Sequence, residues 1–141
     1  MADISERVEF VHSRLRKGFK YTSDREKYGD TDKWVSCLID VQEGNTFEGD
    51  CEDMAITAIE LLKEYREVED KDLRLITCWV EPKPDGSRGG YHAVCGVDTE
   101  DDTLIIDNRF PQVMSAGTLI DKGYIFHKGM RCSEVGQWRL I

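Results

Sequence analysis

The sequence predicts an α+β fold in which helices come first and an antiparallel sheet follows. Apolar residues recur at helical spacing in the first half, over 4–17 and again over 51–65. From residue 73 onward, short runs rich in β-forming residues alternate with turn residues, as they do in a meander. The chain of 141 residues contains no repeat and no linker, so we expect a single domain over 1–141.

The composition limits the partners of the protein. A net charge of -9 argues against nucleic acid and against anionic membranes. No stretch is apolar for long enough to span a bilayer and no signal peptide is evident, so we expect a cytoplasmic location. The five cysteines include no CxxC pair, which favours reduced thiols over a zinc site or a disulfide framework.

The elements before residue 50 are predicted to be helices joined by loops. Ile4, Val8 and Leu15 lie on one face of a helix over 4–17, and His12 is assigned to the side away from that face. Three further segments follow. They are a polar surface loop over 20–33, one or two helical turns over 34–41, and a turn-rich loop over 42–49.

The central helix is predicted to begin at Cys51 and to run to Tyr65. Asp50 precedes it as a favoured N-cap residue, and apolar side chains cover most of its circumference. We therefore expect a largely buried helix whose N-terminus presents a thiol. Unpaired backbone N–H groups and the helix dipole favour the thiolate there, which makes Cys51 a candidate nucleophile.

The second half is predicted to form a sheet of short strands. Three strands are expected over 73–80, 91–98 and 103–107, the first two joined by a long hairpin connection rich in Pro and Gly. Residues 108–122 are expected to be irregular. Further strands are expected over 124–128 and 137–141.

A cysteine nucleophile needs a base and a group that orients the base. His92 opens the second strand, and opposed residues of an antiparallel hairpin have a constant sum of numbers. A tight turn makes that sum roughly 199 to 201, which places Asp107 opposite His92 or diagonal to it on the same face. Val94 and Gly96 share this face, and we expect the helix that begins at Cys51 to pack across it. The spacing thus permits a Cys51–His92–Asp107 triad.

Each of these residues also has a plain structural interpretation. Cys51 would be a small apolar residue in a buried helix. His92 would be a core histidine with its hydrogen bonds satisfied, and Asp107 would belong to a turn that ends a strand.

The run of residues 49–56, Gly-Asp-Cys-Glu-Asp-Met-Ala-Ile, resembles the signature of the bacterial transglutaminase-like cysteine peptidases. With 32–34, 73–76, 92–94 and 104–108, the resemblance extends in order over about residues 21–108. It implies a papain-like, transglutaminase-like core in which the nucleophile-bearing helix packs on an antiparallel sheet. It also implies that Cys51, His92 and Asp107 form the catalytic triad.

Asp50 and Glu52 flank the candidate nucleophile, and carboxylates close to a thiol oppose its ionisation. In one interpretation Asp50 caps the helix, while Glu52 and Asp53 complement the helix dipole from solvent. The resemblance implies another, because a branch of the family is calcium-dependent. Asp50 and Glu52 would then bind calcium, together with further oxygen ligands that the sequence does not identify.

The expected function is that of a cysteine peptidase or amidase, which cleaves a peptide bond of a polypeptide substrate through a thioester acyl-enzyme. An amine in place of water as the acceptor would make the protein a transglutaminase-type acyl transferase. A different class remains open, a calcium-responsive or peptide-binding module on the same fold with a vestigial site. A third alternative is a structural or virion-associated accessory protein.

Overall fold

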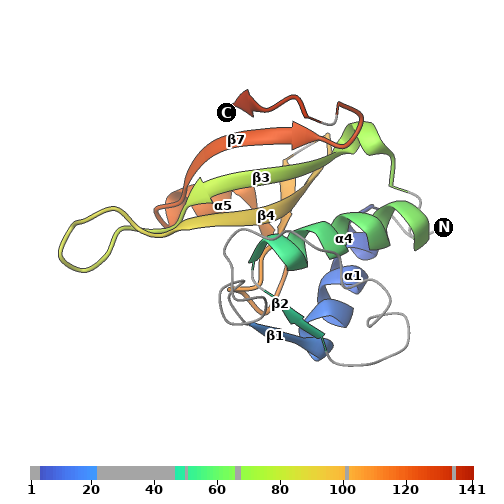
Figure 1. Ribbon diagram of the computed structural model, residues 1–141, viewed down its shortest axis with the longest axis horizontal. Coiled ribbons are helices and arrows are strands. Elements are labelled where there is room, and N and C mark those ends of the chain that lie inside the picture. The colour runs from blue at the N-terminus through green and yellow to red at the C-terminus, as the bar shows by residue number, and fades with distance from the viewer. Residues whose placement is uncertain (1–3, 22–46, 50, 66–67, 101, 135) are drawn as a thin grey trace.

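The computed structural model describes residues 4–21, 47–49, 51–65, 68–100, 102–134 and 136–141 (Figure 1). The first half contains α1 (Ile4–Gly18), β1 (Phe19–Tyr21), β2 (Phe47–Gly49) and α4 (Cys51–Tyr65). A short 3₁₀ turn, η1 (Asp70–Asp72), leads into β3 (Leu73–Trp79), β4 (Tyr91–Asp98), β5 (Thr103–Ile106) and β6 (Met114–Ser115). The chain continues through α5 (Ala116–Asp121), β7 (Ile125–Arg131) and β8 (Arg139–Leu140).

The second half folds into a six-stranded antiparallel sheet with the strand order β6-β5-β4-β3-β7-β8. Strands β3 to β6 form a meander, and β7 then returns to pair with the free side of β3. Helix α4 lies against this sheet and α1 packs on α4 (Figure 1). The α+β prediction is therefore confirmed, with the helix that begins at Cys51 packed on an antiparallel sheet.

The sheet has an apolar cluster on each face. On one face α1 and α4 pack against Leu73, Leu75, Cys95 and Val97. On the other face Leu119 of α5 packs with Ile76, Val94 and Ile105. The alternation of side chains along β3 and β4 separates the two sets.

This alternation corrects the expected position of α4. The helix packs on the face that carries Cys95 and Val97, not on the face of Val94. The space beside Gly96, expected to admit the helix, is filled by the side chains of Ile76 and Thr103. Pairing parity says which residues share a face, but it does not say which face a helix will cover.

The predicted boundaries match the structure closely for α1, α4, β3, β4 and β5. Residues 19–21 and 47–49 were expected in or beside loops, but they form the parallel pair β1 and β2. Residues 108–122 were expected to be irregular, but they contain β6 and α5, whose N-cap Ser115 accepts a hydrogen bond from the backbone N–H of Thr118. The helical turns predicted over 34–41 lie outside the described residues.

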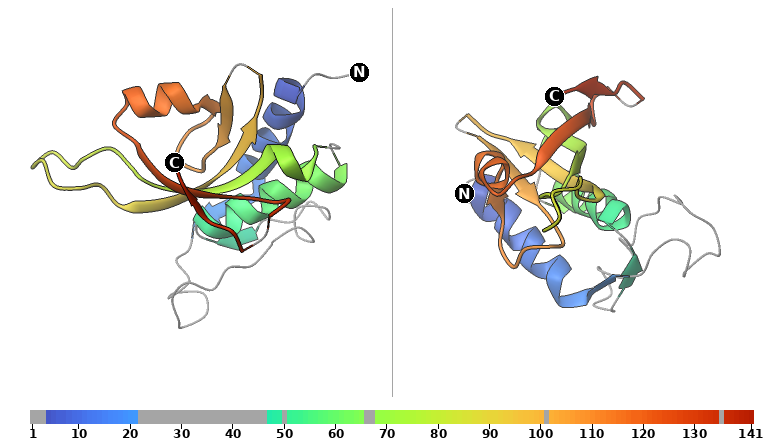
Figure 2. Two further views of the ribbon diagram at one scale, coloured as in Figure 1. Left: turned by 90° about the horizontal axis from the view of Figure 1, so that it is seen from above. Right: turned by 90° about the vertical axis from the view of Figure 1, so that its left-hand side faces the viewer.

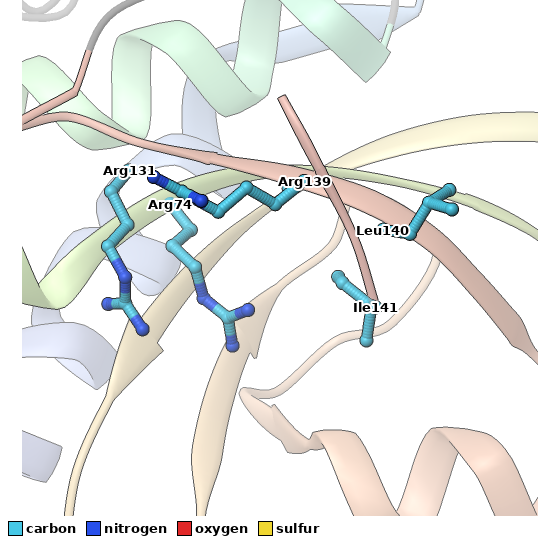
Figure 3. A pocket seen from close by; sticks show the side chains of 6 residues that line it. Arg74, Arg131, Arg139, Leu140 and Ile141 are labelled. Carbon is cyan, nitrogen blue, oxygen red and sulfur yellow. The ribbon is translucent and has the colours of Figure 1, made fainter. Parts of the chain in front are cut away.

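Charged side chains on β3, β4 and β7 hold the strands together at one edge of a hollow of about 230 Å³ (Figure 3). Asp98 accepts hydrogen bonds from Arg74 Nη2 at 2.8 Å and from Arg131 Nη1 at 2.7 Å. Arg139, on β8, pairs with Glu134 at 2.8 Å. Because these guanidinium groups are already paired with carboxylates, we assign this hollow a structural role.

Candidate active site

A cleft of about 280 Å³ lies where the N-terminus of α4 meets the start of β4. Cys51 and His92 both line it, together with Tyr91, Asn108 and Arg109. Strand β5 pairs with β4 only from Cys95 to Asp98. Toward Tyr91 the edge of β4 is no longer paired with β5, so the imidazole can be approached from that edge.

The imidazole of His92 is bonded to the carboxylate of Asp107. The distance from His92 Nε2 to Asp107 Oδ1 is 2.7 Å, and Asp107 is only 1% exposed. A carboxylate can only accept, so Nε2 carries the proton in this bond. Nδ1 is then the ring nitrogen left to exchange a proton with a group in the cleft.

Two further donors fix the carboxylate of Asp107. The backbone N–H of Arg109 donates to Oδ1 at 2.9 Å, and the hydroxyl of Tyr124 donates to Oδ2 at 2.6 Å. Burial alone would raise the pKa of Asp107, but hydrogen bonds from His92 and Tyr124 outweigh it and the pKa is lowered. Burial and the nearby carboxylate raise the pKa of Tyr124, so its hydroxyl remains a donor.

Tyr124 is itself held from the side away from Asp107. Arg109 Nη1 donates to the Tyr124 hydroxyl at 2.9 Å and to Glu81 Oε2 at 2.8 Å. A second hydrogen bond joins Arg109 Nη2 to Glu81 Oε1, which makes the pair bidentate. The hydrogen bond from Arg109 lowers the pKa of Glu81 to about 2. The network thus runs from the start of the β3–β4 connection to the His92–Asp107 pair.

Side chains of helix α1 contact the backbone of the loop that follows β5. His12 Nε2 lies 3.4 Å from the carbonyl oxygen of Asp107, and Arg16 Nη1 donates to the carbonyl oxygen of Phe110 at 3.2 Å. The assignment of His12 to the side away from the apolar face is wrong, because His12 is only 2% exposed. Val8, Val11, His12 and Leu15 form one buried face at the spacing i, i+3, i+4, i+7.

The comparisons with known proteins identify the family and the fold. The bacterial transglutaminase-like cysteine proteinase family (BTLCP) matches residues 2–141. The chain belongs to this family. A comparison with the curated proteins gave no significant match.

Solved structures of Legionella pneumophila LapG have the same fold as this proteinase. The first has a TM-score of 0.68 at 21% identity, over 98% of this chain and 69% of that chain. The calcium-bound form has a TM-score of 0.69 at 21% identity, over 98% of this chain and 69% of that chain. The EGTA-treated form has a TM-score of 0.68 at 20% identity, over 99% of this chain and 68% of that chain. The papain-like, transglutaminase-like fold is therefore confirmed, and family membership makes the protein a cysteine peptidase that acts on polypeptides.

The other described cysteines of the proteinase are poor nucleophiles. Burial raises the pKa of the Cys78 thiol to about 12, and it also raises the pKa of Cys95 and of Cys132. All four described cysteines are free. Only Cys51 combines a helix N-terminus with a histidine in the same cleft, among the cysteines that the structure describes.

The carboxylates considered for calcium lie outside what can be described. Asp50 is not among the described residues, and of Glu52 only the backbone within α4 is. The described part of the chain contains no group of three or more His, Cys, Asp or Glu residues that could hold a metal ion. The alternative that Asp53 faces solvent is wrong, because Asp53 is fully buried. No helix among the described residues is long and apolar enough to cross a membrane.

Sequence reasoning missed the residues that support the His92–Asp107 pair. Tyr124 stands just before a strand and Arg109 stands in a segment expected to be irregular, and neither carries a local signal. The periodicity of α1 does contain a signal for His12, because residues 8, 11, 12 and 15 follow the pattern of one helix face.

The burial of His12 predicts a pH dependence of folding stability. Burial lowers the pKa of His12 below its usual value of 6.5, more strongly than the carbonyl of Asp107 raises it. The unfolded chain then binds the proton more readily than the folded chain. This contribution to stability is present above about pH 6.5 and is lost as the pH falls through the lower, folded-state pKa.

We therefore expect the free energy of unfolding to fall more between about pH 7.5 and about pH 5 in the wild type than in His12→Gln. Glutamine can still donate to the Asp107 carbonyl but does not titrate in this range. Chemical denaturation at both pH values measures the difference. Equal losses in the two proteins would contradict the assignment of a buried, neutral His12.

Proposed function

We propose that the protein cleaves peptide bonds through a thioester at Cys51, with His92 as general base and then general acid and Asp107 as the orienting carboxylate. The observation that supports this proposal best is the 2.7 Å hydrogen bond between His92 and Asp107 beside a cleft that Cys51 also lines. Because Asp107 holds Nε2, Nδ1 is left for the thiol.

The proposed reaction has two stages. His92 Nδ1 takes the thiol proton, the sulfur of Cys51 attacks the carbonyl carbon, and His92 returns the proton to the leaving amine as the C–N bond breaks. Water then gives a proton to His92 and attacks the thioester, which releases the carboxylate and the thiol. The backbone N–H of Cys51, at the start of α4, is the proposed donor to the oxyanion.

Thiol labelling tests the proposal without a known substrate. Near neutral pH, an iodoacetamide probe should modify Cys51 far faster than Cys78, Cys95 or Cys132, because burial raises the pKa of those thiols. Peptide mapping by mass spectrometry gives the rate at each site. Uniformly slow labelling would instead favour a binding module with a vestigial site.

A tyrosine variant tests how the carboxylate is held. Tyr124→Phe removes the hydroxyl that donates to Asp107 and helps to lower its pKa. We expect kcat to fall roughly tenfold with little change in KM, since the lost hydrogen bond involves a charged group. The pKa of Asp107 should rise, so the acid limb of the pH–rate profile should move to higher pH.

The matched control is Tyr91→Phe, whose hydroxyl bonds Thr77 and His127 and not Asp107. The acid limb of the pH–rate profile of this variant should lie at the same pH as that of the wild type. If Tyr124→Phe also leaves the acid limb unmoved, Tyr124 does not tune the orienting carboxylate.

We also propose that calcium binds at Asp50 and Glu52. The support is the pair of carboxylates around Cys51 and the existence of calcium-bound and EGTA-treated structures of LapG, the structural relative. When bound, the ion would supply positive charge that offsets two carboxylates close to the thiol. The further oxygen ligands that calcium requires are not assigned.

A ligand that binds only the folded state raises its stability by mass action. The melting temperature should therefore be higher with calcium than with EGTA, and Asp50→Ala/Glu52→Ala should lose the difference. Magnesium should substitute poorly, because it requires a tighter octahedral site and releases water reluctantly. Identical melting curves with calcium and with EGTA would rule out the site.

A further inference from the structure

A row of large apolar side chains crosses the sheet next to the candidate active site. Trp79 of β3 lies directly opposite Tyr91 of β4 on one side and opposite Ile125 of β7 on the other. Directly opposed residues point to the same face of a sheet, so the three side chains form one surface. Tyr91 is 50% exposed and Ile125 is 52% exposed.

Hydrogen bonds and ring contacts hold the side chains of Tyr91 and Trp79 in place. The hydroxyl of Tyr91 lies 2.7 Å from Thr77 Oγ1 and 2.7 Å from His127 Nδ1. The ring of Trp79 lies 5.1 Å from that of Tyr91 and 4.7 Å from that of His127, measured between centroids. Aromatic side chains fixed in this way give contact area at a low cost in conformational entropy.

The row continues from the cleft along the face that α4 covers. Trp79 and Tyr91 share a face with Leu75 and Cys95, which pack under α4. Helix α4 begins at Cys51, which lines the same cleft as Tyr91. The row lies at the base of the arm formed by the β3–β4 connection (Figures 1 and 2).

We propose that Tyr91, Trp79 and Ile125 bind an apolar segment of the polypeptide substrate on one side of the bond that is cut. This inference rests on the proposed role of Cys51, and the link is Tyr91, which belongs both to the row and to the cleft. An exposed apolar surface continuous with a catalytic cleft is suited to the chain that enters the cleft. Arg88, on the arm, places its guanidinium over the Trp79 ring, 4.3 Å from the ring centroid.

The length of the row predicts which positions of the substrate should prefer apolar residues. From Tyr91 to Ile125 the row spans two strand spacings, which is roughly 10 Å. An extended peptide advances about 3.3 Å per residue, so the row accommodates about three residues. Apolar and aromatic residues should therefore be preferred about two to four positions from the cut, on one side only.

The test is to digest a proteome-derived peptide library and to read the sequences around the cuts by mass spectrometry. The wild type should show apolar enrichment on one side of the cut. Ile125→Ser and Trp79→Ala should lose most of that enrichment, and KM for a peptide chosen from the wild-type cuts should rise about tenfold while kcat is kept. Ile120→Ser is the matched control, because Ile120 is an equally exposed isoleucine on α5, at 56%.

The outcomes separate this inference from the proposed function. Cuts without one-sided apolar enrichment, or an enrichment that Ile125→Ser leaves unchanged, would overturn the binding row while leaving Cys51 in its role. The row would also be overturned if the library stayed uncut by an enzyme whose Cys51 is rapidly labelled. Cleavage that persists in Cys51→Ala would instead overturn the proposed function.

Discussion

Replacing Cys51 with alanine is expected to abolish peptide cleavage while the fold is kept. No other described cysteine lines the cleft, and burial raises the pKa of Cys78, Cys95 and Cys132. Alanine is well tolerated at the start of a helix, so the free energy of unfolding should change by only about 1 kcal/mol. Assays of peptide cleavage and chemical denaturation of the same preparation measure the two effects.

The serine variant tests the chemistry of the same position. Cys51→Ser keeps an oxygen nucleophile beside the same histidine, but an alcohol is far less ionised than a thiol. We expect this variant to be nearly inactive as well. Retained turnover in Cys51→Ala would show that the nucleophile lies elsewhere.

The second large effect is expected at the orienting carboxylate. Asp107→Asn should lower kcat by roughly 10³- to 10⁴-fold, because an amide can hold the imidazole in the wrong tautomer. Three donors, from His92, Arg109 and Tyr124, converge on this carboxylate, so an amide NH₂ placed there must face one of them. The free energy of unfolding should also fall, by roughly 1–3 kcal/mol.

The neighbouring Asn108 provides the comparison. It also lines the cleft, but it makes no hydrogen bond to His92 among the described residues. If Asp107→Asn were fully active while Asn108→Ala was inactive, the orienting role would belong to Asn108. Steady-state kinetics on both variants, with unfolding as a control for stability, distinguishes the two assignments.

Most of the architecture could be predicted from the sequence because its signals are local. The helix after Cys51 has an N-terminal signal and a nearly continuous apolar surface, and a Pro- and Gly-rich connection separates β3 from β4. Helix α5 was missed because six residues that include a glycine are too few to show a period. The pair β1 and β2 was missed because its two strands have three residues each.

The site could be predicted only in part, for a related reason. Hairpin parity placed Asp107 on the face of His92, because the number of residues in a turn fixes the register. The hairpin parity contains no information on Tyr124, which bonds Asp107 from the position just before β7. It also does not predict which face of the sheet α4 covers, since that depends on side chains from elements distant in sequence.

The contacts that α1 makes with the loop after β5 have a consequence for how the protein folds during its synthesis. The bond from His12 to Asp107 closes a span of 95 residues, and that from Arg16 to Phe110 a span of 94. Contacts so remote along the chain form late in folding, because the entropy of closing a long loop must be overcome first. Helix α1 is the first described element to leave the ribosome, yet its contacts with this loop can form only after the loop has emerged. A ribosome-bound chain that has not yet exposed the loop after β5 would therefore lack both of these contacts, and it would also lack the 2.7 Å hydrogen bond between His92 and Asp107.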